Sequence, residues 1–520
     1  MNQLVAAGLA FRRGAPPQAT FLFKHALIRD AAYESLLNSR RQELHYRAAE
    51  ILRNELDRAM AEPEVIAHHF TEARLDDFAI EWWGKAGDKA LRRSAFQEAI
   101  AHLGKAIEMA DKAAATAAAP ATTSETKLSR RMKLQTDYAQ ALFWSKGFAA
   151  EGTEAAFTRA GQLAQQSGSS TERYQVYYGQ WVERFLRGKL NSARETAEAF
   201  LSEAVADGRS TESGVARRLL GLTSTWQGDF VTGRAQLDRA LHDFDRGRDE
   251  SSKLMFGTDN GASTASQLAV ALWHMGEIAR ARQLIEQSIR NANDLGHAPS
   301  KVHVRYIAVG FEAYRHDPAA VFESAQLLVE LSRTHRMDFH AAAGEVFAGW
   351  ARGRLDNTAS GVQAMRKAIA SFAEPGNRIW LPLFHGLLAE LEADTRDTHA
   401  ALSSIEHGLA ISKETGERHT DSFLLRLRGD ILLKRNPFDP APAEECYRTA
   451  VAIAKQQGAR SYELLASFSL AKLYQSADRP AEAHAVLALA LKGFSATPEM
   501  PEIAEAQALL EGLARDDDGA

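Results

Sequence analysis

The chain has 520 residues but only one cysteine, Cys446. A single thiol excludes an intramolecular disulfide framework and any thiolate cluster that would hold zinc or iron–sulfur. Glycine and proline are scarce too, with 35 and 14 residues. So few turn-forming residues exclude an all-β protein punctuated by turns, and they favour helices joined by short connections.

Long apolar runs and a strong net charge are also missing. No apolar stretch approaches the roughly 18–20 residues that span a bilayer, and the first residues lack the pattern of a secretory signal. The sequence has 62 Lys and Arg against 67 Asp and Glu, and this net charge of −5 gives no general attraction to nucleic acid or acidic lipid. We therefore expect a cytoplasmic protein that enters no membrane and does not take nucleic acid as its partner.

What the sequence does contain is a repeat. Several segments begin with a small or polar turn residue and reach, five positions later, a mostly small residue that opens an amphipathic helix. These closing positions are 193, 233, 281, 321, 361, 401, 443 and 483, and the differences between them are 40, 48, 40, 40, 40, 42 and 40. A common period over this length indicates an array of similar structural units.

Each unit is predicted to be a pair of helices. After the turn at Gly276, apolar residues recur every three or four positions, which is the spacing of one helical face, and Gly296 is suited to end that helix. The segment before the turn, residues 268–275, is apolar on more than one side. Such a helix packs both on its partner and on the next unit. Small residues such as Ala281 and Ala401 fit places where two helix backbones approach closely.

This pattern of turn and small residue resembles that of tetratricopeptide repeats (TPR), in the longer version found in large bacterial regulators. The resemblance implies an all-α fold: a right-handed superhelical array of TPR-like helix pairs of about 40 residues, with an extended concave surface. We expect the array over residues 128–514 and its first helix pairs over 61–111. An Ala/Thr-rich linker is expected over 112–127, and a disordered acidic tail over 515–520.

The first sixty residues differ from the rest. Residues 9–13, 14–17 and 20–23 read as strand, turn and strand, and two helices are predicted over 25–37 and 40–56. The text from residue 21, FLFKHALIRDAAYESLL followed by RRQELH at residues 40–45, resembles the end of the winged-helix module in bacterial STAND signalling ATPases (signal-transduction ATPases with numerous domains). Many of these carry a class III adenylate/guanylate cyclase domain before a TPR-like array. The resemblance implies that residues 1–60 form a partial winged helix.

The resemblance also suggests one functional residue. In related STAND ATPases a Met-His-Asp motif opens the corresponding helix, and its histidine contacts the β-phosphate of bound ADP. His25 matches that histidine, although Lys24 and Ala26 replace the other two residues. A histidine donor and a neighbouring ammonium at a helix start suit a phosphate. The alternative is that His25 only closes the junction between hairpin and helix.

Catalytic motifs are missing. No P-loop Gly-x-x-x-x-Gly-Lys-Ser/Thr occurs, and no α/β pattern exists that would carry the metal-binding aspartates of a class III cyclase. We therefore expect a chain that is not an enzyme and needs no cofactor. Because the sequence starts at the wing of a winged helix, we expect it to be the C-terminal part of a longer architecture.

Other groups of residues give weaker signals. His68 and His69 are adjacent on a helix, so their side chains diverge by about 100° and do not chelate one ion together. Arg40, Arg41, His45 and Arg47 suit phosphate or nucleic acid, but such a cluster also covers a helix face or pairs with Glu43 and Glu50. Trp226, Trp273 and Trp350 lie near repeat turns, either as packing residues or as part of a groove for a partner.

The function predicted from these signals is that of a protein-interaction or regulatory module. The array would act as a sensor that binds a protein or peptide partner in its concave groove, the partner being for example an ATPase or cyclase domain. Two alternatives stay open. In the first, the chain is a subunit or fragment of a cyclase or ATPase whose catalytic domains act in trans. In the second, it is a transcriptional regulator.

Overall fold

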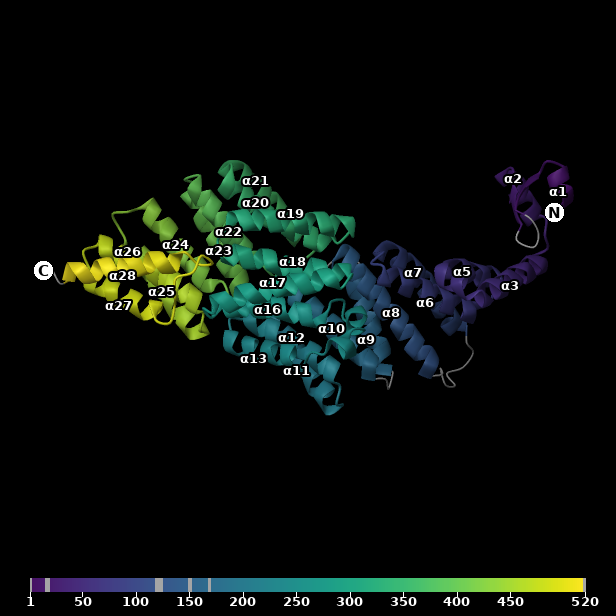
Figure 1. Ribbon diagram of the computed structural model, residues 1–520, viewed down its shortest axis with the longest axis horizontal. Coiled ribbons are helices and arrows are strands. Elements are labelled where there is room, and N and C mark those ends of the chain that lie inside the picture. Colours follow the sequence, from purple (N-terminus) through teal and green to yellow (C-terminus); the bar gives the residue numbers. More distant parts are fainter. Residues whose placement is uncertain (1, 15–18, 117–124, 148–151, 167–169, 518–520) are drawn as a thin grey trace. The chain divides into compact units, whose positions relative to one another are not determined.

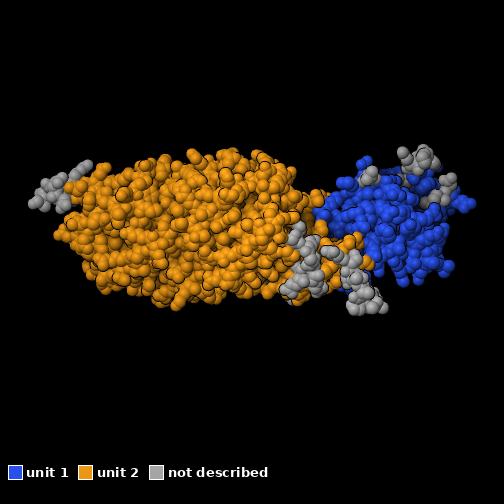
Figure 2. Space-filling model, turned by 90° about the horizontal axis from the view of Figure 1, so that it is seen from below, with its two compact units in different colours: residues 1–90, 98–123 blue, residues 91–97, 124–520 orange. Residues whose placement is uncertain are grey.

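The computed structural model describes residues 2–14, 19–116, 125–147, 152–166 and 170–517. These form two compact units, residues 1–90 with 98–123 and residues 91–97 with 124–520 (Figure 2). Throughout the described ranges the chain is mainly helical, and they hold one small sheet of two strands (Figure 1). The prediction of an all-α fold of TPR-like helix pairs with one β-hairpin is confirmed.

The first unit begins with the predicted hairpin. Strands β1 (Ala10–Arg13) and β2 (Thr20–Phe23) pair antiparallel, with Ala10 opposite Phe23 and Arg13 opposite Thr20. Residues 15–17 of the predicted turn lie outside the described residues. The helices of this unit are α1 (Asn2–Ala6), α2 (Ala26–Glu34), α3 (Asn38–Asn54), α4 (Leu56–Ala61), α5 (Pro63–Glu72) and most of α6 (Asp76–Arg92) and α7 (Phe96–Thr116). The two helices predicted after the hairpin are α2 and α3.

The second unit is a series of antiparallel helix pairs (Figure 1). Its helices are α8 (Glu125–Lys146), α9 (Thr153–Gln166), α10 (Ser170–Leu186), α11 (Leu190–Ala206), α12 (Ser210–Trp226), α13 (Phe230–Asp243), α14 (Arg246–Asp249), α15 (Ser252–Met255), α16 (Asn260–His274), α17 (Ile278–Asp294), α18 (Ala298–Tyr314), α19 (Pro318–Thr334), α20 (Asp338–Leu355), α21 (Thr358–Ala373), α22 (Leu381–Asp394), α23 (Thr398–Thr415), α24 (Asp421–Arg435), α25 (Ala441–Gln457), α26 (Arg460–Ser476), α27 (Pro480–Leu491) and α28 (Glu502–Asp517).

Two predicted boundaries differ from the structure. Both ends of the predicted linker over 112–127 are helical, because α7 continues to Thr116 and α8 begins at Glu125. Its middle, residues 117–124, lies outside the described residues. The predicted acidic tail also starts too early, since α28 runs to Asp517 and only residues 518–520 lie outside the described range. The alanines that open the predicted linker are strong helix formers, and an extension of the preceding helix into them is the alternative interpretation of that segment.

The predicted register of the repeat is confirmed by the backbone at the turns. The turn residue has a positive φ in six of the predicted units, whether or not it is glycine: Gly188, Gly228, Gly276, His316, Arg396 and Asp478. In the last three, φ is 56°, 65° and 58°, in the left-handed region that side chains other than glycine disfavour. The geometry of the turn is thus kept even where the sequence does not favour it.

The small residue five positions later allows two helices to approach closely. A Cβ atom on Gly361 would lie 2.4 Å from the Cα atom of Gly353 on the preceding helix. A Cβ atom on Gly233 would lie 2.4 Å from the hydroxyl oxygen of Thr225. Ala281 and Ala401 occupy the same position in their units and are fully buried. This is the role that the sequence predicts for them.

Side chains at equivalent positions of neighbouring repeats also bind one another. The indole nitrogen of Trp350 donates to Glu390 over 3.0 Å, and Arg354 lies 2.5 Å from Asp394. Lys434 approaches the same Asp394 at 3.4 Å. All three pairs are 40 residues apart in sequence, so the period is visible in the contacts as well as in the turns.

The longest interval of the repeat, from position 233 to position 281, has a structural cause. Between α13 and α16 the chain forms two extra short helices, α14 and α15, where the other repeats have a short loop. The segment that follows, Phe256 to Asp259, is buried, and the carboxylate of Asp259 accepts from the backbone N–H of Ala262 to cap α16. The insertion therefore brings additional residues into the interior of the array.

Candidate functional site

Around α16 the interior of the second unit is packed, so a continuous concave groove like the one predicted is not left along the described inner helices. Every residue of α16 is buried, and α12, α18, α20 and α22 are buried over most of their length. A helix that lines an open groove would expose one face to solvent. In the described residues of this unit, these first helices of the pairs therefore face protein on all sides.

The interior is filled because successive turns of the superhelix stack on one another. The carbonyl oxygen of Leu186 accepts from the backbone N–H of Arg378 over 2.8 Å. The carbonyl oxygen of Trp226 accepts from the backbone N–H of Arg418 over the same distance. The carbonyl oxygen of Trp273 accepts from the Ser461 hydroxyl at 2.5 Å. In each case the partners are separated by nearly five repeats. One superhelical turn of the array therefore takes nearly five repeats, and the following turn packs directly against it.

The three tryptophans near the repeat turns are packing residues. Trp226, Trp273 and Trp350 are fully buried. The Trp226 ring lies 5.5 Å from that of Trp380, and the Trp273 ring lies 5.6 Å from that of Tyr462, between ring centroids. Such edge-to-face pairs contribute roughly 0.5–1.5 kcal/mol beyond burial. The packing interpretation therefore fits all three, and Trp226 also lines an internal cavity.

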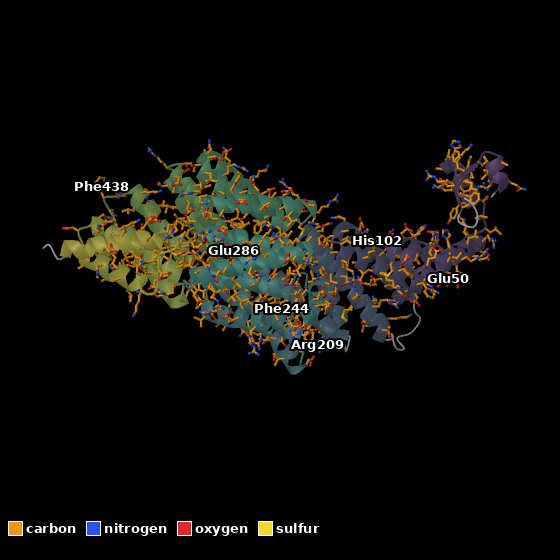
Figure 3. All side chains as sticks on the ribbon, in the orientation of Figure 1. Glu50, His102, Arg209, Phe244, Glu286 and Phe438 are labelled. Carbon is orange, nitrogen blue, oxygen red and sulfur yellow. The ribbon has the colours of Figure 1, made fainter. Side chains whose placement is uncertain are left out.

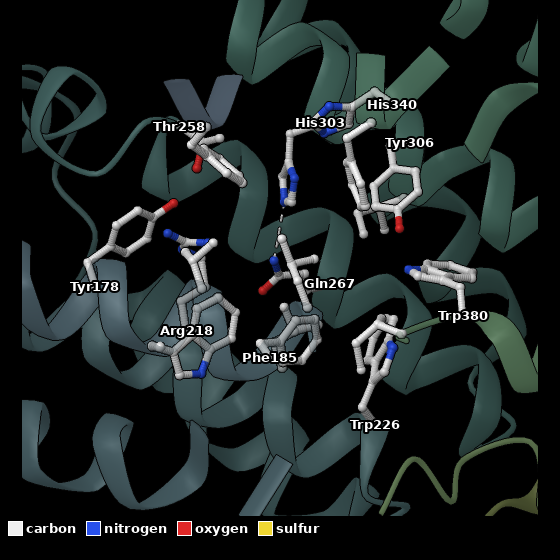
Figure 4. A pocket seen from close by; sticks show the side chains of 18 of the residues that line it. Tyr178, Phe185, Arg218, Trp226, Thr258, Gln267, His303, Tyr306, His340 and Trp380 are labelled. Carbon is white, nitrogen blue, oxygen red and sulfur yellow. Dashed lines mark hydrogen bonds between the residues drawn. The ribbon is translucent and has the colours of Figure 1, made fainter. Parts of the chain in front are cut away.

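Within this interior lies a cavity of about 70 Å³ (Figure 4). Its walls are largely aromatic and come from several repeats, including Trp144 of α8, Trp181 of α10 and Trp380 before α22. Gly257 of the insertion makes room beside it, because a Cβ atom there would lie 2.8 Å from the indole nitrogen of Trp144. The cavity is thus an apolar space enclosed by distant parts of the sequence.

One charged side chain faces this apolar space. Arg218 of α12 is buried, and its Nε donates to the Asn260 amide oxygen over 2.8 Å. Its Nη2 is buried without a hydrogen-bond partner among the described residues. Burial lowers the pKa of Arg218, although Tyr178 and the more distant Asp259 partly offset this effect. The guanidinium is nevertheless the group that stays protonated at neutral pH.

Uncharged polar groups accompany Arg218 in the cavity wall. The hydroxyl oxygen of Thr258 and the amide oxygen of Gln267 are buried without hydrogen-bond partners in the described structure. Gln267 Nε2 lies 3.4 Å from His303 Nε2. Figure 4 shows the hydroxyl of Tyr178 and that of Thr258 on the side of the Arg218 guanidinium. Polar groups of the wall thus lie beside the Arg218 cation, while the Tyr306 hydroxyl and the Trp226 indole nitrogen lie across the cavity from it (Figure 4).

The histidines of the wall do not add positive charge at neutral pH. Burial, reinforced by the charge of Arg218, lowers the pKa of His303 to about 3. Burial also holds the pKa of His340 well below its ordinary value, with His303 adding to the effect. Chemically, the cavity can take an anion at Arg218 and an apolar group against the aromatic rings.

Sequence reasoning missed this cavity. Arg218 and Asn260 are 42 residues apart, and neither belongs to a motif. The signal that pointed to the region was the long interval between positions 233 and 281, because its extra residues place Thr258 in the wall. The one interval of 48 residues therefore indicates the segment that contributes to the cavity wall.

His25, the candidate phosphate contact, lies in the first unit. It is exposed and immediately precedes α2, and its side chain makes no capping hydrogen bond to that helix. Its neighbour Lys24 is exposed as well and places its ammonium 4.8 Å from the centroid of the Phe11 ring. The role of His25 toward a phosphate stays a prediction.

The structure adds a third histidine to His68 and His69. His45 Nδ1 lies 2.7 Å from His69 Nδ1, and the Tyr33 hydroxyl lies 2.9 Å from His45 Nε2. Burial lowers the pKa values of His45 and His69. Even so, the described part of the chain holds no group of three or more His, Cys, Asp or Glu side chains arranged to hold a metal ion.

The basic cluster of α3 is engaged on the surface. Arg40 lies 2.5 Å from Glu43, and Arg41 donates to the Asn38 amide oxygen over 2.6 Å. Glu50 pairs instead with Arg53, at 2.8 Å. The interpretation of this cluster as a helix face with local pairs therefore fits Arg40.

The first unit exposes an unusual amount of apolar surface. None of the described residues of α2 is buried, and Leu27 and Leu37 are 82% and 77% exposed. Phe11 and Leu22 of the hairpin are more than half exposed. We call these four side chains the apolar surface of the first unit. Phe11 and Leu22 lie opposite each other in the hairpin, and large exposed apolar side chains are suited to contact another molecule.

The sequence is similar to a known protein over most of its length. No family model matches the sequence. The chain is 23% identical over 481 residues to an uncharacterized protein of Rhizobium meliloti (strain 1021), a match that covers 91% of this chain and 45% of that protein. The chain thus spans less than half the length of this curated relative.

Solved structures with similar arrangements are helical. Cut9–Hcn1 of the APC/C has a TM-score of 0.48 and 13% identity, covering 90% of this chain and 86% of that one. A STAND protein with a tetratricopeptide repeat sensor from Pyrococcus horikoshii has a TM-score of 0.39 and 13% identity, covering 76% and 54%. Rap protein complexed with competence and sporulation factor has a TM-score of 0.36 and 11% identity, covering 85% and 98%. Among the described helices of our chain, none combines the length and apolarity that a bilayer crossing requires.

Proposed function

We propose that this chain is a non-catalytic regulatory module that binds a protein partner through the apolar surface of its first unit. The partner we propose is a nucleotide-binding signalling protein, an ATPase or a cyclase, whose catalytic domains act in trans. TPR-like helical repeats are typical of protein-interaction modules. The resemblance of residues 21–45 to the end of a STAND winged helix supports the choice of partner.

Two exposed leucines, Leu27 in α2 and Leu37 at the start of α3, are the observation that carries this proposal. Leu27 and Leu37 stand almost fully in solvent, although leucine side chains gain roughly 1.5–3 kcal/mol each when they are buried. A helix of nine residues with no buried side chain has little tertiary packing to hold it. A partner domain that covered these leucines would stabilise the helix and explain their presence.

The partner site is therefore proposed outside the array. The predicted groove is filled by stacked superhelical turns, as Arg378 and Leu186 illustrate. Along the described helices α12, α16 and α18 a protein segment has no open concave surface to enter, whereas an open hollow of about 520 Å³ lies at the ends of α20, α22 and α24 and is lined by residues that include Arg354, Asp394 and Lys434. In this proposal the array acts as the sensor and the first unit transmits its state to the partner.

The test is affinity purification of the full chain with quantitative mass spectrometry. The double variant Leu27→Glu and Leu37→Glu places two charges in the apolar surface and is expected to lose an ATPase or cyclase that the wild-type chain retains. Phe438→Glu is the matched control, because Phe438 is 97% exposed in the second unit (Figure 3). Equal recovery of the same proteins by both variants would sink the proposal, and so would ATP turnover by the purified chain alone.

His25 is proposed to contact a phosphate of nucleotide bound by that partner. Its exposed ring beside the start of α2 and the neighbouring Lys24 ammonium support this. We expect His25→Ala to weaken ADP binding by the assembled complex without lowering partner recovery. His242→Ala serves as a control in the second unit. An unchanged ADP affinity would leave His25 with the junction role only.

A further inference from the structure

We propose that the cavity at Arg218 binds a short-chain carboxylate, with the carboxylate group on the guanidinium and the alkyl group against the aromatic walls. This inference rests on the proposed function, because it names the ligand that the array would sense. It concerns the second unit only.

The buried charge of Arg218 is the first argument. A guanidinium removed from water loses several kcal/mol of hydration unless a counter-charge or hydrogen bonds replace it. The Arg218 side chain hydrogen-bonds Tyr178 and its Nε donates to Asn260, but its Nη2 is unsatisfied in the described structure. Arg315, an arginine of the same unit whose side chain is also buried, instead has the carboxylate partners Glu312 and Glu499. A carboxylate ligand would supply what the Arg218 site lacks.

The size and lining of the cavity define the rest of the ligand. A cavity of about 150 Å³ holds benzene with its six heavy atoms, so a volume of about 70 Å³ holds roughly three, and a slightly larger ligand needs the side chains of the wall to move apart. The rings of Trp144, Trp181 and Phe185 present apolar surface to it. Acetate and propionate come nearest to this size with one anionic end and a short apolar body, and butyrate is the larger comparison.

Two of the other unpartnered groups of the wall complete the site. The Thr258 hydroxyl can donate to a carboxylate oxygen. The amide of Gln267 can do the same when its oxygen and nitrogen exchange places, since the oxygen then accepts from His303 Nε2–H and the NH2 group faces the cavity. Arg218, Thr258 and Gln267 would thus provide donors to one anion from three separate elements.

The position of these elements makes the site suitable for sensing. Arg218 lies on α12, Thr258 follows the insertion, and Gln267 lies on α16. A ligand that bridges them adds a tie between neighbouring repeats at the centre of the unit. It would therefore stabilise one spacing of the repeats over others, which is how a ligand shifts a conformational equilibrium.

The experiment measures the melting temperature of the purified full chain with and without propionate. Wild type is expected to gain several degrees in a saturable manner, with a Kd between about 10 μM and 10 mM for so small a ligand. Arg218→Met keeps much of the length of the side chain and removes the charge. We expect its melting temperature without ligand to equal or exceed that of wild type, because an unpaired buried charge is gone, and its response to propionate to vanish.

Arg315→Met is the matched control. Arg315 is also buried, with 8% of its side chain exposed, but it is paired with two glutamates. Its removal is expected to lower the melting temperature and to leave the response to propionate intact. If Arg218 only held the fold together, Arg218→Met would lower the melting temperature in the same way, and this result would overturn the proposal.

A second variant and other anions keep the test decisive if Arg218→Met does not fold. Thr258→Val is nearly isosteric and is expected to weaken propionate binding at least fivefold in calorimetry. Sodium chloride and inorganic phosphate serve as further probes. Equal stabilisation by all anions, or a response that persists in both cavity variants, would mean a general salt effect and overturn the carboxylate assignment. So would the absence of any response to propionate or butyrate.

Failure of this inference differs from failure of the proposed function. Propionate binding needs no partner, whereas partner recovery needs no propionate. If partner recovery depends on Leu27 and Leu37 but no carboxylate binds, the ligand assignment fails alone. If propionate binds while the apolar surface recovers no specific partner, the proposed function fails and the cavity assignment stands.

Discussion

The hydroxyl of Tyr314 lies 2.8 Å from Nε2 of His419, and both side chains are buried although 105 residues separate them. Tyr314 ends α18, and His419 stands in the connection before α24. Their hydrogen bond joins parts of the array that no local pattern relates. Such contacts between distant repeats give the second unit one continuous core.

Removing that hydroxyl should weaken the second unit. Tyr314→Phe leaves Nε2 of a buried imidazole without a partner, so we expect a loss of about 1–3 kcal/mol in the free energy of unfolding by urea. Tyr33→Phe is the matched control, because Tyr33 makes the same bond to His45 at 2.9 Å on an exposed surface. It should change stability by less than about 0.5 kcal/mol. Equal losses of unfolding free energy in the two variants would show that burial does not increase the contribution of this hydrogen bond.

The close backbone approach between Gly361 and Gly353 predicts that a larger residue destabilises the repeat. Gly361→Ala would place a methyl group 2.4 Å from the Cα atom of Gly353, where backbone rather than a flexible side chain must move. We expect a destabilisation of about 1–3 kcal/mol in thermal or urea unfolding. Gly512→Ala in α28 meets no atom within 4 Å and should instead be neutral or stabilising. Similar effects of both changes would refute the close-approach argument.

A substitution in a strained turn is expected to increase the stability of the second unit. Arg396 has a φ of 65° in a turn where other repeats have glycine, and it is exposed. Arg396→Gly should therefore stabilise the second unit by about 0.5–1 kcal/mol, measured as a higher urea midpoint with an unchanged m-value. Arg435→Gly, near the end of α24, removes an exposed arginine from helical backbone and should destabilise. A loss of stability in both variants would contradict the strain at Arg396.

Buried histidines predict a loss of stability in mild acid. Burial lowers the pKa of His274 to about 4, from about 6.5 when unfolded. Above a pH of about 6.5 both states are neutral at this site and it contributes nothing. Between those two pKa values only the unfolded state binds the proton, so stability falls by about 1.4 kcal/mol per pH unit as the pH decreases.

The variant His274→Phe isolates this contribution. Its stability relative to wild type, measured by urea unfolding at several pH values, should improve steadily as the pH falls from about 6.5 to about 4. The difference is used because raised pKa values of buried acids such as Glu417 act in the opposite sense in both proteins. A difference that does not vary with pH would mean that His274 titrates alike in both states.

Local order in this protein could be predicted from its sequence. The regular period located the turns, because a turn needs residues that accept a positive φ and a helix pair needs a small residue at its crossing. Gly276 and Ala281 satisfy both demands, and the structure places them accordingly. The hairpin of residues 10–23 followed from the same local reasoning.

The closure of the array could not be predicted in this way. Whether superhelical turns stack depends on small rotations between repeats that accumulate over nearly five units, and no residue type encodes them singly. Trp226 therefore allowed two consistent interpretations, and only the structure shows that its ring is buried against Trp380 and also lines the cavity. The same is true of Arg218, whose unsatisfied Nη2 is visible only in three dimensions.

The insertion of α14 and α15 has a consequence for how such a protein changes over time. Its residues interrupt the period without shifting the register of the helix pairs on either side. A segment of this kind can be lengthened, shortened or rewritten while the scaffold around it keeps its crossings. The residues beside this segment, such as Thr258 in the cavity wall, can thus change while the architecture is kept.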